Sequence, residues 1–294
     1  MKLLHENASP KTQSFVIVLV FGVWFLKILP DPVYLISLLP ISVFESVGFL
    51  WAVPISVRHL LINSLFLNAL KIATLFSLAL VILSTFRKPA AIFACIFITI
   101  YQGIIRGFGG HIHHGDLVLL YSAYFLALFP IADDIVQRYK KLSSEIKENV
   151  CGIPLVAAFT TLCLTYTFVG LYRIVHGGVD VFSSGSITFW ALRDSYQVLN
   201  PAWGFGRLLL EYPLLEKMLI LGFPVITVFE VLAPICLFSR FFRYVFLLAM
   251  IPFHFLSWLF MEVFFWENIV LFVLFFDIEG IVKRLTLRKI VPNL

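Results

Sequence analysis

Long apolar stretches alternate with short polar segments along almost the whole chain. Several approach the length of about 17 to 25 residues that an α-helix needs to cross a bilayer. A soluble core in a chain of this size requires no runs of that length, so the pattern predicts membrane-spanning helices. We expect eight spans, near residues 14–29, 62–85, 89–107, 117–132, 152–175, 218–238, 244–262 and 267–278.

The stretch at residues 33–53 is also apolar, but Pro40 and Glu45 interrupt it. Two interpretations stand in place of a ninth span: a re-entrant segment, or a segment that lies on the membrane surface. A ninth span would also disturb the distribution of basic residues between the two sides. The predicted fold is therefore a single all-α transmembrane domain over residues 1–294, a bundle of eight spans.

The composition excludes a water-soluble fold. Of the 294 residues, 61% are hydrophobic, 13% are charged and 32 are Phe, and the mean hydropathy is +0.97. Soluble domains have about 45–50% apolar and about 25% charged residues. The net charge of +5 does not predict a nucleic-acid partner, because the basic residues are dispersed between apolar stretches rather than gathered on one face.

The basic residues instead predict the topology. If both termini are cytoplasmic, 14 of the 22 Lys and Arg residues fall in cytoplasmic segments, as the positive-inside rule requires. Residues 133–150 then form a charged inner loop, and residues 108–116 and 176–217 are outer segments. Within the second, residues 187–199 show a helical period with Trp190 at headgroup depth, which predicts an interfacial helix on the outer face.

Three titratable side chains, Lys71, Glu230 and His254, fall inside predicted spans. Such groups are costly in a bilayer unless they are paired or hydrated. Their predicted depths are similar, so the three would meet in one layer. Two interpretations stand: a structural network that fixes helix packing, and a proton relay or ligand site. We expect Glu230 and His254 to lie within hydrogen-bonding distance, directly or through one water.

Polar side chains share one face of the seventh span. His254, Trp258 and Glu262 recur every fourth residue, so they form a row from mid-bilayer to the outer surface. The row predicts the wall of a pocket that opens to the outside. For Glu262, an ordinary interfacial position is the equal alternative.

A similar face occurs on the fifth span. Tyr166, Gly170 and Arg173 lie on one side of the helix, and His176 follows just beyond the outer boundary. Gly170 permits the close approach of a neighbouring helix. Arg173 either holds an anionic group or simply extends its side chain to the interface.

The densest titratable cluster is the glycine-rich turn with His111, His113, His114 and Asp116. No second ligand motif accompanies it, so we predict no metal site. A histidine that donates a hydrogen bond or shuttles a proton at the membrane surface is one interpretation, because imidazole titrates near neutral pH. A solvated loop is the other.

Four segments occur in an order that resembles the horizontally transferred transmembrane (HTTM) domain family. The resemblance extends over about residues 90–278. The family contains the membrane part of the vitamin K-dependent gamma-carboxylase and many bacterial proteins, which implies a bacterial inner membrane. The segments are HIHHGDLVLLYSAYFLALFP (111–130), FVGLYRIVHGGVDVF (168–182), FEVLAPICLFS (229–239) and FHFLSWLFMEVFFWENIVLFVLFF (253–276).

The resemblance implies an enzyme that deprotonates a vitamin K-like hydroquinone at the outer face, with a histidine after the third span and a lysine near the end of the fifth. The histidine position corresponds to His114 in HHGDL, and the lysine position corresponds to Arg173 in VGLYR. Arginine stays protonated in proteins and cannot act as an amine base. This departure leaves it open whether the chain is a carboxylase-like enzyme.

We therefore expect an outward-facing polar pocket that binds a quinone or lipid-like amphiphile from the bilayer. Two alternatives are a non-catalytic module that docks another membrane protein, and a proton-coupled transporter that uses the three titratable groups inside the spans. The catalytic candidates are His114, Arg173, Glu230 and His254, and the ligand-binding candidates are Lys71, Tyr166, His176, Trp258 and Glu262.

Overall fold

The computed structural model describes residues 4–5, 8–45, 48–85, 87–109, 114–138, 144–177, 205–261 and 265–281, and every regular element in them is a helix. The chain divides into two compact units. The N-terminal unit comprises His5–Ala158 and Asp277–Leu294, and the C-terminal unit comprises Met1–Leu4 and Phe159–Phe276. The long helix α6 (Ser144–Gly177) contributes residues to both units.

Five helices are long and apolar enough to cross a membrane. At most half of the residues in each of these segments are buried inside the protein, so their other faces present apolar side chains to the surroundings. Such surfaces are typical of lipid-facing helices and indicate an integral membrane protein. The five segments are Pro10–Ile28 (α1), Ser64–Ile82 (α3), Arg87–Phe108 within α4 (Arg87–Gly109), Gly152–Gly177 within α6, and Arg240–Met261 (α10).

The other three predicted spans also fall on helices, but these are shorter or more charged. Helix α5 (His114–Arg138) has an apolar part at Asp116–Leu128. Helix α9 (Pro213–Val231) carries two Glu and one Lys among its 19 residues. The last predicted span is the short helix α11 (Trp266–Leu271) followed by the 3₁₀ helix η7 (Phe272–Phe275).

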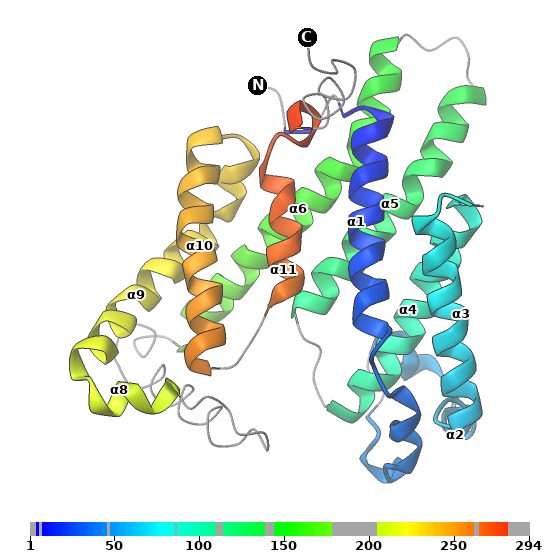
Figure 1. Ribbon diagram of the computed structural model, residues 1–294, viewed down its shortest axis with the longest axis horizontal. Helices are drawn as coiled ribbons and strands as arrows, with labels where there is room; N and C mark the ends of the chain where they lie inside the picture. The colour runs from blue at the N-terminus through cyan, green and yellow to red at the C-terminus, as the bar shows by residue number, and fades with distance from the viewer. Residues whose placement is uncertain are drawn as a thin grey trace, which may run out of the picture. The chain divides into compact units, whose positions relative to one another are not determined.

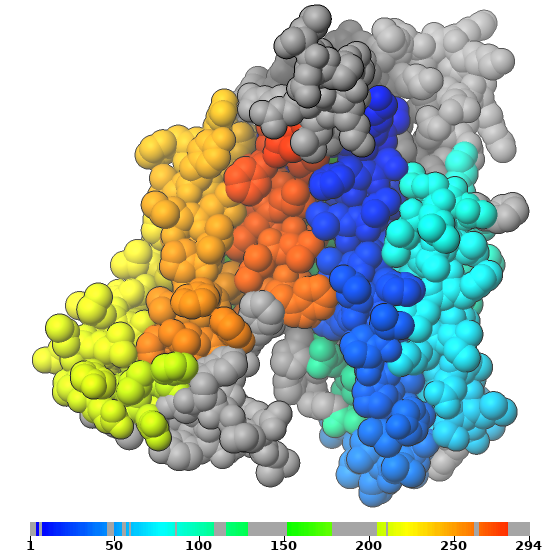
Figure 2. Space-filling model, in the orientation of Figure 1, coloured from blue at the N-terminus to red at the C-terminus, as the bar shows by residue number. Residues whose placement is uncertain are grey.

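In the N-terminal unit, α3 packs against α1 and α4, and α5 packs against α4 and α1, as the ribbons of Figure 1 show. The side chains of α1 and α3, blue and cyan, adjoin along their length on the face seen in Figure 2. Val20 and Trp24 of α1, Leu78 of α3, and Ala94 and Ile98 of α4 are fully buried. Small side chains such as Ala94 let membrane helices approach closely.

The apolar stretch at residues 33–53 does not form a continuous helix. It consists of three short 3₁₀ helices, η1 (Val33–Leu38), η2 (Ile41–Val43) and η3 (Gly48–Ala52), and α2 (Ile55–Leu61) follows. Proline cannot donate the backbone hydrogen bond that a longer helix would need at position 40. How this stretch is placed relative to the membrane stays a prediction.

This stretch lies against the end of α4. The Glu45 N–H donates a hydrogen bond to the Gly107 carbonyl oxygen at 2.8 Å. The Phe44 ring covers Gly107 so closely that a Cβ at that position would overlap the ring. A glycine at position 107 is therefore required for this contact.

The segment at residues 133–150, which the sequence predicts as an inner loop, is more helical than expected. Helix α5 continues to Arg138 and α6 begins at Ser144. Charged residues such as Glu, Lys and Arg are good helix formers, so they extend both helices beyond the apolar parts. The interfacial helix predicted at residues 187–199 lies outside the described residues.

The two ends of the described chain meet at the start of α1. Ser9 is the N-cap residue of this helix. The Glu279 carboxylate accepts hydrogen bonds from the Ser9 N–H at 2.9 Å and from the Thr12 hydroxyl at 2.5 Å. A carboxylate is favourable at a helix N-terminus because it satisfies free N–H groups and opposes the helix dipole.

The C-terminal unit contains a cluster of aromatic side chains. Helix α9 leads through η6 (Ala233–Leu237) into α10, and α11 and η7 follow. Phe246 of α10 stacks on Phe275 of η7 with 5.2 Å between the ring centroids, and Phe159 of α6 meets Phe275 edge to face at 4.9 Å. The Phe-rich composition therefore supplies a buried aromatic core as well as apolar outer faces.

Candidate functional site

Arg173 of α6 forms an ion pair with Glu230 of α9 in the C-terminal unit. The guanidinium Nη1 donates to the Glu230 carboxylate oxygen Oε2. The Glu230 side chain is only 2% exposed, whereas the Arg173 side chain is 25% exposed. The buried carboxylate is therefore neutralised by a cation whose far end remains accessible.

Gly170 makes this pairing possible. It lies one turn before Arg173 on the same face of α6, where a Cβ atom would be 3.0 Å from the Glu230 Cβ and 2.9 Å from a methyl group of Val231. Thr167, one turn earlier, donates a hydrogen bond to the Val231 carbonyl oxygen at 3.4 Å. The close helix approach that the sequence predicts at Gly170 is present, and its partner is α9.

Two aromatic rings flank the Arg173 guanidinium. Its central carbon lies 5.0 Å from the centroid of the Phe223 ring and 5.6 Å from that of Phe253. Phe223 belongs to α9, seven residues before Glu230, and Phe253 belongs to α10. A guanidinium over aromatic faces is held by electrostatic attraction to the rings, so three helices fix the position of Arg173.

Tyr166 and His254 form a second buried pair in the same unit. The Tyr166 hydroxyl and His254 Nε2 are 2.8 Å apart, and the two residues are 5% and 3% exposed. The rings of Phe246 and Phe272 pack around them. The other ring nitrogen of His254, Nδ1, is buried and has no hydrogen-bond partner among the described residues.

The sequence predicts that Glu230 and His254 are joined directly or through one water, and in the structure each of them has another described partner. Glu230 pairs with Arg173, and His254 pairs with Tyr166. The reason is that α6 supplies two long polar side chains on one face, and each of them satisfies one of these groups.

Lys71 belongs to the N-terminal unit and has a backbone partner there. Its amine donates to the Asp31 carbonyl oxygen at 2.6 Å. Glu230 and His254 belong to the C-terminal unit, so the predicted layer of these three side chains stays a prediction.

Of the remaining predicted site residues, the structure describes the side chains of His176 and Trp258. His176 is exposed at the end of α6, where its ring meets the edge of the Tyr172 ring at 4.1 Å. Trp258 is half-buried and packs against Phe255 at 5.8 Å between centroids. Glu262 lies outside the described residues, and the side chain of His114 does too.

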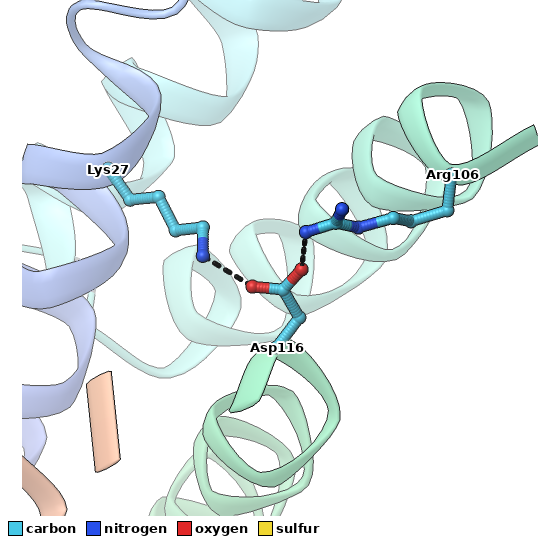
Figure 3. A network of polar contacts seen from close by, with 3 residues as sticks. All are labelled: Lys27, Arg106 and Asp116. Atoms are coloured by element: carbon cyan, nitrogen blue, oxygen red, sulfur yellow. Dashed lines mark hydrogen bonds and ion pairs between the residues drawn. The ribbon is translucent and has the colours of Figure 1, made fainter. Parts of the chain in front are cut away.

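The N-terminal unit contains a polar network that the sequence analysis did not predict. Asp116, at the start of α5, is 5% exposed and lies between Lys27 of α1 and Arg106 of α4 (Figure 3). Each carboxylate oxygen accepts from one of the two cations. The sequence indicated Lys27 and Arg106 only as topology signals. Lys27 and Arg106 lie in the last turns of two helices, and Asp116 lies in the first turn of the next one. This arrangement of charges at helix ends is the sequence signal from which the network could have been predicted.

The Arg173–Glu230 pair can bind a ligand and the Tyr166–His254 pair can exchange protons. The described part of the chain offers no metal centre. Within it, no group of three or more His, Cys, Asp and Glu side chains could hold a metal ion. A partly exposed guanidinium can bind an oxygen anion or a carbonyl group, and a tyrosine next to a histidine can transfer a proton.

Compared with known proteins, the chain matches no family model, no curated protein and no solved structure.

Proposed function

We propose that the chain binds a quinone or lipid-like amphiphile of the bilayer through the Arg173 guanidinium. The observation that carries this proposal is the combination of the buried Glu230 carboxylate, the two flanking rings and the 25% exposure of Arg173. A guanidinium has five N–H donors. Among the described contacts, Arg173 uses one of them, and the others are available to a ligand.

The surroundings of Arg173 favour an amphiphile over a small hydrophilic ion. Glu230 neutralises the charge, so the site attracts a carbonyl or phosphate oxygen by directed hydrogen bonds more than by net charge. Phe223 and Phe253 offer apolar contact to the ring or tail next to that oxygen. A quinone and a lipid headgroup both have this combination of a polar acceptor and an apolar body.

The Tyr166–His254 pair would serve a quinone in particular. Reduction of a quinone consumes protons, and oxidation of the hydroquinone releases them. His254 lies next to Phe253, which contacts Arg173, and Tyr166 is seven residues from Arg173 on α6, about 10 Å along the helix axis. The pair thus belongs to α6, which carries the guanidinium, and to α10, which contacts it, and the Nδ1 of His254, without a partner among the described residues, is a candidate proton acceptor.

The proposal includes eight spans with both ends of the chain on one side of the membrane. The hydrogen bonds from Ser9 and Thr12 to Glu279 join the two ends, which requires an even number of crossings between them. The five long apolar helices, together with α5, α9 and the segment Trp266–Phe275, supply eight. The excess of basic residues in the inner segments of this topology supports a cytoplasmic location of both ends.

We retain the resemblance to the HTTM domain family as part of the proposal. Arg173 would occupy the position of the family's lysine, where a permanently charged side chain is a clamp for the ligand and not a base. His114, at the start of α5, would be the family's histidine. Carboxylation through an amine base is not part of the proposed function.

Identification of the bound molecule tests the proposal. The full chain is purified in mild detergent, and small molecules that remain bound are extracted and identified by mass spectrometry. We expect a quinone or lipid-like molecule to be retained by the wild type and largely lost from Arg173→Ala. Arg207→Ala is the matched control, because Arg207 is an exposed arginine in the same unit. Equal retention by Arg173→Ala and Arg207→Ala would reject the site.

A further inference from the structure

The segment at residues 29–63 joins two antiparallel helices, α1 and α3, on one side of the N-terminal unit. Lys71, two turns into α3, donates to the carbonyl oxygen of Asp31, just beyond the end of α1. Arg87, just beyond the end of α3, donates to the hydroxyl of Ser14, near the start of α1, at 2.9 Å. The end of α1 therefore lies beside the start of α3, and the segment connects two helix ends on the same side.

Helix α4 ends on this side too. The carbonyl oxygen of Gly107, near the end of α4, accepts a hydrogen bond from the Glu45 N–H, so the segment reaches from α1 and α3 to the end of α4. In Figure 1 the segment and α2 accordingly lie at one end of these helices. Because α1, α3 and α4 are long and apolar enough to cross a membrane, this end of the unit belongs at one surface of the bilayer.

The outer surface of the segment is too apolar for water. Residues 33–63 contain only two Asp, Glu, Lys or Arg residues, Glu45 and Arg58. The Arg58 guanidinium is turned back to the main chain, where it donates to the Val53 and Trp51 carbonyl oxygens. Soluble surfaces rarely expose large apolar patches. Three apolar side chains of the segment are mostly exposed: Leu38 at 77%, Trp51 at 78% and Leu60 at 66%.

The backbone of the segment is too irregular for the hydrocarbon core. Its helices η1, η2, η3 and α2 have only three to seven residues each. Helix ends leave backbone N–H and C=O groups without intrahelical partners, and lipid tails cannot satisfy them. A re-entrant segment tolerates such backbone only where protein or water surrounds it, whereas this segment has an exposed apolar surface. The membrane interface accepts both the apolar side chains and the irregular backbone.

A shallow depression in the segment has the same mixed character. The Ser37 hydroxyl donates to the Tyr34 carbonyl oxygen at 2.7 Å, and the Asn63 side chain accepts from the Leu65 N–H at 2.8 Å. Neutral polar groups beside apolar side chains match the boundary between lipid headgroups and acyl chains. The depression is lined by Ser37, Asn63 and Ser64 together with Leu39, Ile41 and Ile62.

The apolar surface of the segment continues on to a helix that is long enough to cross the membrane. Leu65, Ile72 and Phe76 recur along one face of α3, and all three are largely exposed. If α3 crosses the bilayer, this face contacts lipid. Lipid therefore covers the face of α3 and the adjoining segment without a break, so we name lipid as the partner of the segment.

We infer that residues 33–63 are an interfacial anchor, a segment that lies in the surface of one leaflet with Leu38, Trp51 and Leu60 inserted among the lipids. Tryptophan is favoured at this depth because its ring is apolar and its N–H is polar. The inference rests on the membrane-crossing helices of the proposed function, but not on a ligand at Arg173.

The depth of spin labels in lipid vesicles tests the inference. The full chain carries one nitroxide at Leu38→Cys, Trp51→Cys or Leu60→Cys on a background without other cysteines. Collision with oxygen, which concentrates in the hydrocarbon core, and with a water-soluble nickel chelate is measured by power saturation. We expect both reagents to reach all three labels, at depths within about 10 Å of the lipid phosphates. Phe76→Cys, exposed near the middle of α3, is the matched control and should meet oxygen alone.

The three labels distinguish the anchor from its alternatives. Contact with the chelate alone would mean a segment in water, contact with oxygen alone a segment in the hydrocarbon core, and contact with neither a segment covered by protein, and each result would overturn the inference. A Phe76→Cys label that meets the chelate would overturn the spans of the proposed function as well.

Photoreactive lipids test the wild-type chain, which keeps the inference falsifiable if the cysteine-free background does not fold. One lipid has its diazirine next to the glycerol, and the other has it at the end of an acyl chain. We expect peptides from residues 33–63 to be labelled preferentially by the first lipid. Equal labelling by both lipids, or stronger labelling by the second, would overturn the inference.

Discussion

Gly170 and Glu230 are in such close contact that a methyl group at residue 170 would lie 3.0 Å from the Glu230 Cβ. This contact sets the separation of α6 and α9, and the separation determines whether the Arg173 guanidinium reaches the Glu230 carboxylate. A helix with a larger residue at this position would hold the two charges apart. The site therefore depends on a residue without any side chain.

Replacing Gly170 should destabilise the C-terminal unit. In Gly170→Ala the new methyl group also lies 3.0 Å from the Thr227 carbonyl oxygen and 2.9 Å from a Val231 methyl group, and overpacking of this kind costs about 1–3 kcal/mol. Gly222→Ala on α9 is the matched control, because a Cβ there has no atom within 4 Å and alanine is the better helix former. The measurement is unfolding of the purified protein in detergent. Equal stability of the two variants would show that α6 and α9 do not pack this closely.

Removing the Glu230 carboxylate should cost more than removing an exposed one. Glu230→Ala leaves the partly buried Arg173 guanidinium without its anion, and breaking a buried ion pair costs about 3–5 kcal/mol. Glu211→Ala, in the exposed part of the same unit, should change the free energy of unfolding by less than about 0.5 kcal/mol.

The double variant Arg173→Met with Glu230→Leu completes this comparison. It removes both charges, so it should be more stable than Glu230→Ala alone. A double variant as unstable as the sum of its single variants would mean that the two side chains do not interact.

Removal of the Tyr166 hydroxyl should leave His254 Nε2 without its hydrogen-bond partner. In Tyr166→Phe both ring nitrogens of the buried imidazole lack a partner, since Nδ1 already has none among the described residues. An unsatisfied buried polar group costs about 1–3 kcal/mol. Tyr172→Phe is the control, because Tyr172 is 64% exposed. If the two Phe variants unfold at the same temperature, the Tyr166–His254 hydrogen bond contributes nothing to stability.

The topology predicts opposite labelling of two engineered cysteines. On a background without other cysteines, Ser144→Cys at the start of α6 should be protected from an impermeant thiol reagent in intact cells, because residues 133–150 are predicted to be cytoplasmic. Ser184→Cys, in the predicted outer segment, should react. The reverse pattern would mean that the orientation is inverted.

The sequence predicts the positions of the apolar helices better than the contacts between them. Hydrophobic runs and the glycine at position 170 depend on local spacing, and a single helix face is enough to recognise Tyr166, Gly170 and Arg173 as neighbours. The choice of partner depends on which helices pack together, and no periodicity contains that information. The sequence therefore predicts a link between Glu230 and His254, directly or through one water, whereas α6 supplies a separate partner for each.

The Lys27–Asp116–Arg106 network was not predicted for the same physical reason. Lys27, Arg106 and Asp116 are each unremarkable at a helix end, where charged side chains are common. Only the packing of α1, α4 and α5 brings them together. Lys71 shows the converse, because a titratable residue inside a span draws attention in the sequence although a backbone carbonyl oxygen is enough to satisfy it.

The variant Arg173→Lys tests whether the side chain at position 173 only binds the ligand or can act as a base in a carboxylase-like reaction. If the site resembles the carboxylase in everything but this residue, the lysine variant should gain oxygen uptake that depends on added hydroquinone. We expect no such gain, because a ligand-binding role for Arg173 does not require the other parts of that reaction. Hydroquinone-dependent oxygen uptake by Arg173→Lys, absent from Arg173→Met, would make the chain carboxylase-like.

The central claim is that the Arg173 guanidinium holds an amphiphile by directed hydrogen bonds. Retention of the co-purified molecule, quantified by mass spectrometry for wild type, Arg173→Lys and Arg173→Ala, tests it most directly. The lysine variant keeps the charge but loses the planar fork of donors, so retention should decrease in the order wild type, Arg173→Lys, Arg173→Ala. Equal retention by all three proteins would contradict the claim and leave Arg173 as the structural partner of Glu230 alone.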